Sequence, residues 1–157
     1  TRLVQVNWQR CQGVDGFAWD THWNNFAAHK EYLVPPFDLA FDSLMTDLDK
    51  TGQLEETLVV VASEFGRSPK ITKSNAGREH WPECFSVLFA GGGIKGGQVY
   101  GKSDKIAGRP AENPMTPADF VATIYHCLGI DPAGEIHDQA NRPISLSKGA
   151  PVMALVE

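Results

Sequence analysis

The stretch TLVVVASEFGRS, residues 57–68, decides the fold expected of this sequence. Residues 57–63 form a continuous apolar run rich in β-branched valine, the pattern of a strand covered on both faces in a parallel sheet. FSVLFAG, residues 85–91, is a second run of the same kind. Because helical patterns alternate with these strands, the sequence predicts an α/β domain with a mainly parallel sheet flanked by helices.

A helical region precedes the first of these strands. From Phe26 to Lys50 the apolar residues recur at helical spacing, but Pro35 and Pro36 interrupt the run. Proline clashes with the preceding turn and restricts the residue before it. The pattern therefore predicts a short helix, then a longer one from about Pro36 to Lys50 that ends at Gly52 as its C-terminal glycine.

Two further elements are predicted towards the ends of the chain. RLVQVNW, residues 2–8, alternates apolar and polar side chains and indicates a strand. Thr116, Pro117 and Asp119 form a favourable helix start, since threonine caps, proline suits the first position and aspartate favours the positive end. This helix is expected to end at Gly129.

Composition is typical of one globular domain spanning residues 1–157, with 42% hydrophobic residues. The net charge of −5 and the scattered basic residues argue against a nucleic-acid partner.

The chain has three cysteines, an odd number, and they lie far apart in the sequence: Cys11, Cys84 and Cys127. We therefore expect buried thiols rather than a disulfide framework. The sequence contains no run of about 18 apolar residues that would predict a membrane span, and its first residues do not have the pattern of a secretion signal.

Polar side chains follow the first buried strand at the end where open parallel sheets bind ligands. Glu64 and Arg67 come directly after residues 57–63. Ligands of open α/β sheets lie outside the carboxyl ends of the strands, which makes both residues candidates for a site. The alternative is that they pair with each other or cap a helix.

Two loop clusters add potential metal ligands. Asp20 and His22 follow the first predicted strand, and His80 precedes the strand at residues 85–91. Carboxylate oxygen and imidazole nitrogen are the donors that Zn²⁺ and similar divalent ions take. The other histidines, at helical positions or in a late loop, are interpreted as structural or surface residues.

Two arginines lie close to these candidates in the sequence. A guanidinium group matches the oxygens of phosphate or sulfate, so Arg67 and Arg78 are candidate contacts for an anionic substrate whose ester bond a metal would polarise. The alternative for each is that it neutralises a neighbouring carboxylate.

The order of these motifs resembles the C-terminal part of the alkaline phosphatase-like superfamily, which includes sulfatases, phosphodiesterases and cofactor-independent phosphoglycerate mutases. Within it, the sequence is most similar to a bacterial, sulfatase-like family of unknown function, domain-of-unknown-function family fifteen-oh-one. The matching stretches are FAWDTHWNNF (17–26), LEETLVVVASEFGRSPKI (54–71), GREHWPECFSVLFAGGGIKGGQVYG (77–101) and PMTPADFVATIYHCLGID (114–131).

The resemblance implies a set of metal ligands. Asp20 and His22 correspond to the first Asp and His of the superfamily, Glu64 to the Asp of its Asp-His pair, and His80 to its later His. Phe65 replaces the His of that pair, and the first pair is spaced more closely than usual. Zinc is the expected ion, while Ca²⁺, Mg²⁺ or Mn²⁺, a single ion, or none stay open.

The resemblance also implies a function. It predicts the C-terminal part of a larger domain that hydrolyses a small phosphate or sulfate ester, or a sulfated or phosphorylated polymer, in the periplasm or outside the cell. The superfamily's nucleophile lies in an N-terminal half that nothing in this sequence matches, so the chain is either a fragment or a shortened relative, and is expected to be inactive alone. The alternative is a non-catalytic binding or structural module of the same fold.

Overall fold

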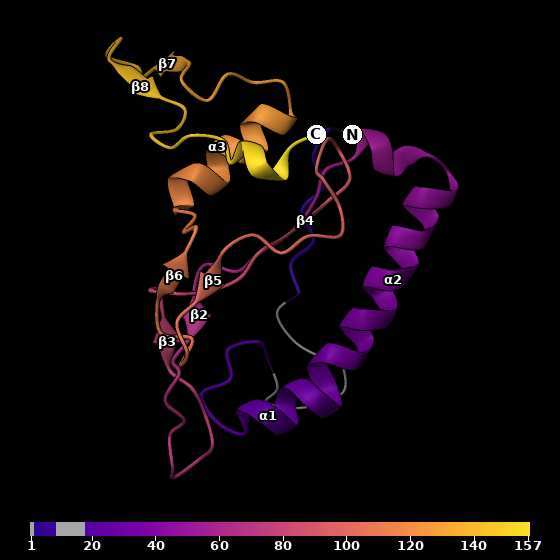
Figure 1. Cartoon of the computed structure of the whole chain (residues 1–157), viewed down its shortest axis with the longest axis vertical. Helices are drawn as coiled ribbons and strands as arrows, with labels where there is room; N and C mark the ends of the chain where they lie inside the picture. The colour runs from indigo at the N-terminus through magenta and orange to yellow at the C-terminus, as the bar shows by residue number, and fades with distance from the viewer. Residues whose placement is uncertain (1, 9–17) are drawn as a thin grey trace.

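The computed structural model describes residues 2–8 and 18–157 of the chain. In Figure 1, the long helix α2 forms one side of the molecule and the small ribbons β2/β3 and β5/β6 the other. The elements in chain order are α1 Asn25–Ala27, a π-helix Ala28–Leu33, α2 Val34–Lys50, a 3-10 helix Gln53–Glu56, β1 Val59–Val61, β2 Gly66–Arg67, β3 His80–Trp81, β4 Leu88–Ala90, β5 Lys102–Ser103, β6 Pro110–Glu112, α3 Pro117–Cys127, β7 Glu135–His137, β8 Pro143–Ser145 and a 3-10 helix Met153–Leu155.

The chain stays helical from α1 to the end of α2, so the expected break at the two prolines is wrong. Pro35 and Pro36 are the second and third residues of α2, and neither has an N–H to donate to the helical turn before it. The turn before them is π-helical, and the Val34 N–H donates to the His29 carbonyl, five residues back. The expected end of α2 is confirmed, because Gly52 adopts a left-handed φ of 71° just after it.

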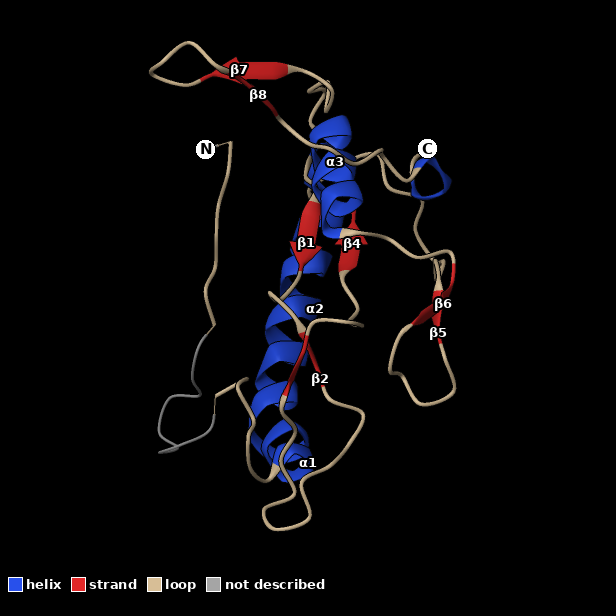
Figure 2. Cartoon of the chain, turned by 90° about the vertical axis from the view of Figure 1, so that its left-hand side faces the viewer, coloured by secondary structure: helices blue, strands red, loops and turns tan. Residues whose placement is uncertain are grey.

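The two apolar runs form strands where the sequence predicts them, but they pair in antiparallel fashion. β1 and β4 lie side by side (Figure 2), with Val59 opposite Ala90 and Val61 opposite Leu88. A parallel connection needs a crossover of a dozen or more residues, usually a helix. Residues 62–87 instead fold back through the antiparallel ribbon β2/β3, so the chain returns beside β1 in the opposite direction.

All strand pairs among the described residues are antiparallel, in four two-stranded sheets. The sequence analysis expected a mainly parallel sheet of alkaline phosphatase-like type, and that larger fold stays a prediction.

The strand expected at residues 2–8 does not form. This segment has no strand assignment and belongs to none of the ladders of the described residues, and Leu3, Val4 and Val6 are exposed. An alternating pattern becomes a strand only when a neighbouring strand takes its backbone hydrogen bonds. The segment is held at its end by Trp8, whose ring packs against Phe37 of α2 at a centroid distance of 6.1 Å.

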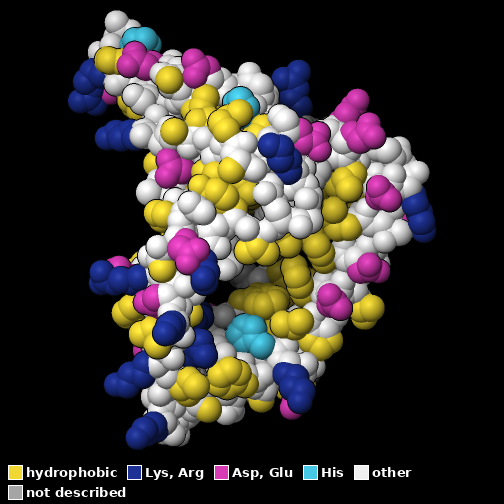
Figure 3. Space-filling model, in the orientation of Figure 1, with side chains coloured by type: hydrophobic (Ala, Val, Ile, Leu, Met, Phe, Trp, Pro, Cys, Tyr) yellow, Lys and Arg dark blue, Asp and Glu magenta, His cyan; other side chains and the backbone are white. Residues whose placement is uncertain are grey.

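Few apolar residues are buried in the described part of the chain. They are Ala28, Leu33, Ile94, Ala122, Leu155 and Val156. No residue of α2 is fully buried, and its apolar side chains lie along a hollowed surface in Figure 3. No helix among the described residues has both the length and the apolar character needed to cross a membrane.

The cysteines that the structure describes, Cys84 and Cys127, are free and half-buried, so the expectation of buried thiols holds in part. Burial raises the pKa of the Cys127 thiol above its usual value. Cys11 lies outside the described residues.

The start of α3 confirms the capping predicted from the sequence. The Thr116 hydroxyl accepts a hydrogen bond from the Asp119 N–H at 3.1 Å, and the Thr116 N–H donates to the Asp119 carboxylate at 3.0 Å. These reciprocal bonds form a capping box. Gly129, with a φ of 72°, ends the helix as expected.

Replacing Thr116 by alanine is expected to lower the free energy of unfolding by about 1 kcal/mol, because one N–H of the first turn loses its acceptor. Urea denaturation of the two proteins measures the difference. Ser74→Ala, at an exposed loop position, is the control and should change stability little. Equal midpoints for Thr116→Ala and the wild type would show that the cap contributes nothing.

Candidate metal centre

Two loops far apart in sequence meet through backbone hydrogen bonds to form the site. The N–H groups of Asn24 and Asn25 donate to the carbonyls of Asn75 and Ala76 at 2.8 and 3.0 Å. The Arg78 N–H donates to the Thr21 carbonyl at 3.2 Å. These bonds hold the loop that carries Asp20 and His22 against the segment that leads into β3.

Gly77 allows this close approach. A Cβ atom at this position would lie 1.8 Å from the His22 carbonyl oxygen and 2.7 Å from the Trp23 nitrogen. Both are backbone atoms, which cannot rotate out of the way as the end of a side chain can. A residue without a side chain is therefore required where the two loops touch.

The ribbon β2/β3 lies on the other side of the site from the loop that carries Asp20 and His22 and contributes His80 to it. Arg67 lies opposite His80 in the ladder, so the two side chains share one face of the ribbon. The ring of Phe65 packs against the His80 ring with centroids 4.2 Å apart. The His22 ring also lies close to the His80 ring, with the two centroids 4.7 Å apart.

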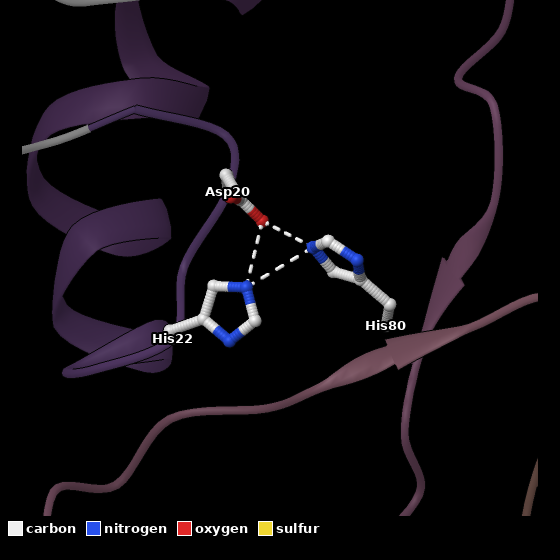
Figure 4. Close-up of side chains that lie close together, drawn as sticks. All are labelled: Asp20, His22 and His80. Carbon is white, nitrogen blue, oxygen red and sulfur yellow. Dashed lines mark hydrogen bonds and ion pairs between the residues drawn. The ribbon is translucent and has the colours of Figure 1, made fainter.

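Asp20, His22 and His80 converge on one point (Figure 4). The Asp20 Oδ1 atom lies 2.8 Å from His80 Nε2 and 3.1 Å from His22 Nε2. The two Nε2 atoms lie 3.0 Å apart. Asp20 and His22 from one loop and His80 from β3 thus each point one potential ligand atom at the same small space. These three side chains form the cluster.

The spacing of these three atoms fits a bound divalent ion. Ligands in tetrahedral positions about 2.0–2.1 Å from zinc lie roughly 3.3 Å apart, and adjacent ligands of an octahedral ion at a similar bond length lie about 3.0 Å apart. The observed edges of 2.8 to 3.1 Å are close to both. Two imidazoles favour zinc and related transition ions over Ca²⁺ or Mg²⁺, which prefer oxygen ligands.

Glu79 contacts the opposite side of His22. Its Oε2 atom lies 2.9 Å from His22 Nδ1, so both ring nitrogens of this histidine are engaged. The sequence places Glu79 beside His80, but the ligand set implied by the resemblance omits it. Only the folded chain shows that Glu79 and His80 reach the same imidazole.

Arg67 pairs with the Asp20 carboxylate and lies largely within the protein, with 20% of its side chain exposed. Its guanidinium also donates to the carbonyls of Trp19 and Arg78 at 3.2 and 3.3 Å. The hydrogen bonds from Arg67 and then from His80 hold the pKa of Asp20 at about 2, below the ordinary value of 3.8. Asp20 is therefore ionised at neutral pH, as a metal ligand must be.

This pKa shift has a consequence at acid pH. A carboxyl group with a depressed pKa in the folded state stabilises the protein above its unfolded pKa, near 3.8, and loses this contribution as the pH falls towards about 2. We therefore expect Asp20→Asn to be less stable than the wild type near pH 5, and the gap to narrow as the pH approaches 2.

Urea denaturation of both proteins across this pH range measures the difference in their free energies of unfolding. Asp42→Asn, an exposed aspartate of α2, is the matched control and should show no such trend. A gap that is constant or that widens on acidification would refute the role of the Asp20 ion pair.

The structure does not bring all the expected residues together. Glu64 is exposed and lies outside the group of three ligands found among the described residues. Arg78 stacks over the Phe26 ring, with its guanidinium carbon 5.2 Å from the centroid. Its buried Nε atom has no hydrogen-bond partner in the described part of the chain. Of the two arginines expected to contact an anion, the structure places Arg67 at the cluster.

A cleft of about 380 Å³ lies beside the same ribbon. Its lining residues include Lys70, Trp81 and Arg109, and the Trp81 ring is held by a hydrogen bond from its Nε1 to the Gly108 carbonyl at 2.7 Å. Trp81 follows His80 in β3, and successive side chains of a strand point to opposite faces. The cleft therefore lies across the ribbon from the cluster.

The two imidazoles and one carboxylate define a class of site, a candidate centre for a single metal ion. Residues 1–156 of the chain match a family described as protein of unknown function (DUF1501). The chain belongs to this family. No curated protein and no solved structure matches the sequence.

Proposed function

We propose that Asp20, His22 and His80 bind one divalent metal ion, with zinc the favoured ion, in a hydrolase of phosphate or sulfate esters. The observation that carries this proposal is the convergence of three ligand atoms within 3.1 Å of one another. Such atoms, each with a lone pair, repel unless a proton or a cation lies between them. The resemblance to the alkaline phosphatase-like superfamily supports the same assignment.

The residues around the centre suit an anionic ester. A bound ion would polarise the ester oxygen and stabilise the charge that develops there. Arg67 positions Asp20 through an ion pair. The other hydrogen bonds of its guanidinium group among the described residues go to two backbone carbonyls. A guanidinium has five N–H donors, so Arg67 keeps donors for an oxygen of the substrate.

Phe65 favours one ion rather than two. It stands where the resemblance would place a second histidine ligand, and its ring packs on His80 instead of offering a donor atom. The nucleophile is proposed to come from a segment outside this chain, and the hydrolytic function is proposed for the full-length protein.

One observation favours a second candidate function, a non-catalytic module of the same fold. Arg67 and Asp20 already form an ion pair, which satisfies both charges without a substrate. Under this alternative the cluster would stabilise the contact between two loops, with or without a metal.

The experiment that separates the two functions uses the full-length protein that contains this chain, loaded with zinc and assayed with 4-nitrophenyl phosphate and 4-nitrophenyl sulfate. The hydrolase predicts release of 4-nitrophenol that is lost in Asp20→Asn. Zinc binding without turnover of either ester would support the module. Neither zinc binding nor turnover would overturn the metal centre.

A further inference from the structure

We propose that Glu79 is the positioning residue of the metal centre, an outer carboxylate that holds His22 in the tautomer and orientation needed to offer its Nε2 lone pair to the ion. This inference rests on the proposed metal site. It adds a residue that is not itself a ligand and that acts through His22.

The geometry of His22 carries the argument. Glu79 Oε2 lies 2.9 Å from Nδ1, while Nε2 faces His80 at 3.0 Å and Asp20 at 3.1 Å. An ionised carboxylate only accepts hydrogen bonds, so the nitrogen next to it must carry the proton. In the neutral ring the lone pair then lies on Nε2, the atom that points into the cluster.

The backbone fixes where Glu79 stands. The Ser68 N–H donates to the Glu79 carbonyl at 2.8 Å, which ties this residue to the chain just after β2. One residue earlier, the Arg78 N–H donates to the Thr21 carbonyl, which anchors the same segment to the loop of His22. Glu79 and His80, adjacent in sequence, thus contact one imidazole through its two different nitrogens.

The other carboxylates near this segment do not serve the same purpose. Glu83 pairs with Arg109 at 3.5 Å. Asp20 faces the ligand nitrogen of His22 rather than Nδ1. Among the described residues, Glu79 is therefore the carboxylate placed to set the tautomer of His22.

The contact between Glu79 and His22 should affect metal affinity more than the stability of the fold. The Glu79 side chain is 62% exposed, and exposed ion pairs contribute little to stability. Carboxylates that bind the second nitrogen of a metal-ligating histidine are worth about 10- to 100-fold in metal affinity. Replacing Glu79 should therefore change the zinc affinity and the tautomer of His22 together.

The test measures both quantities in the wild type, Glu79→Ala and Glu79→Gln. Zinc affinity is obtained by competition with a chromophoric chelator, and the His22 tautomer by long-range ¹H–¹⁵N correlation NMR of the zinc-free protein. Glu83→Gln, which removes a nearby carboxylate that does not contact the cluster, is the matched control.

We expect the wild-type His22 ring to carry its proton on Nδ1. Glu79→Ala should bring in the Nε2–H tautomer and weaken zinc binding by about 10- to 100-fold. Glu79→Gln should lie between, since its carboxamide oxygen can still accept from Nδ1–H, and it serves as the test if the alanine variant does not fold. Glu83→Gln should match the wild type.

The outcomes distinguish the two proposals. If the wild type binds zinc and Glu79→Ala binds it equally well with an unchanged tautomer, the role of Glu79 is refuted and the metal centre stands. If the wild type binds no zinc under conditions in which it is folded, the metal centre itself is refuted, and the positioning role with it.

Discussion

Replacing His80 by alanine is expected to abolish stoichiometric zinc binding. His80 is the ligand that β3 contributes, and its Nε2 atom makes the shortest edge of the cluster, 2.8 Å to Asp20. Without it, one carboxylate and one imidazole remain, which is fewer than the three protein ligands of catalytic zinc sites. The loss should exceed the roughly 10- to 100-fold that removal of an outer-shell partner costs.

Elemental analysis by inductively coupled plasma mass spectrometry measures the zinc content after dialysis against a metal-free buffer. His126→Ala is the matched control, since His126 is a histidine of α3 away from the cluster. The control should retain the zinc of the wild type. A His80→Ala protein that keeps one equivalent of zinc would show that the ion binds elsewhere.

Replacing Gly77 by alanine is expected to separate the two loops that form the site. The added methyl group would lie 1.8 Å from the His22 carbonyl oxygen and 2.1 Å from its carbonyl carbon, so the backbone itself must shift. Overpacking of this kind costs about 1–3 kcal/mol of the free energy of unfolding. Zinc affinity should fall as well, because the shift carries His22 away from His80.

The comparison uses Gly96→Ala as its control. A Cβ atom added at Gly96 would meet no other atom within 4 Å, and the residue has no left-handed φ, so alanine is tolerated there. Chemical denaturation gives the stability of each variant, and the chelator competition gives its zinc affinity. Gly77→Ala with the stability and the affinity of the Gly96→Ala protein would refute the requirement for a glycine between the loops.

The local elements of the fold follow from short-range rules and were predictable. The cap at Thr116 and the left-handed glycines Gly52 and Gly129 depend on residues within one helical turn. The valine run at β1 also forms a strand as expected. The uninterrupted helix at Pro35 departs from the local rule for proline, and a π-helical turn comes directly before it.

The candidate site was predictable in part. Asp20, His22 and His80 were singled out from residue type and position, and the structure brings them together. Glu64 was singled out on the same grounds and remains outside the cluster. Position after a buried strand shows that a side chain is near the strand's end but not the direction in which it points.

The sequence by itself determined the composition of the candidate centre and the elements that carry it, since ligand types, caps and strand runs are properties of neighbouring residues. The tertiary structure decided which ligands meet, because the contact between the loops at Gly77 involves residues more than 50 positions apart. It also decided the role of Glu79. A hydrogen bond to one nitrogen of an imidazole depends on the rotation of that ring, which only packing in three dimensions sets.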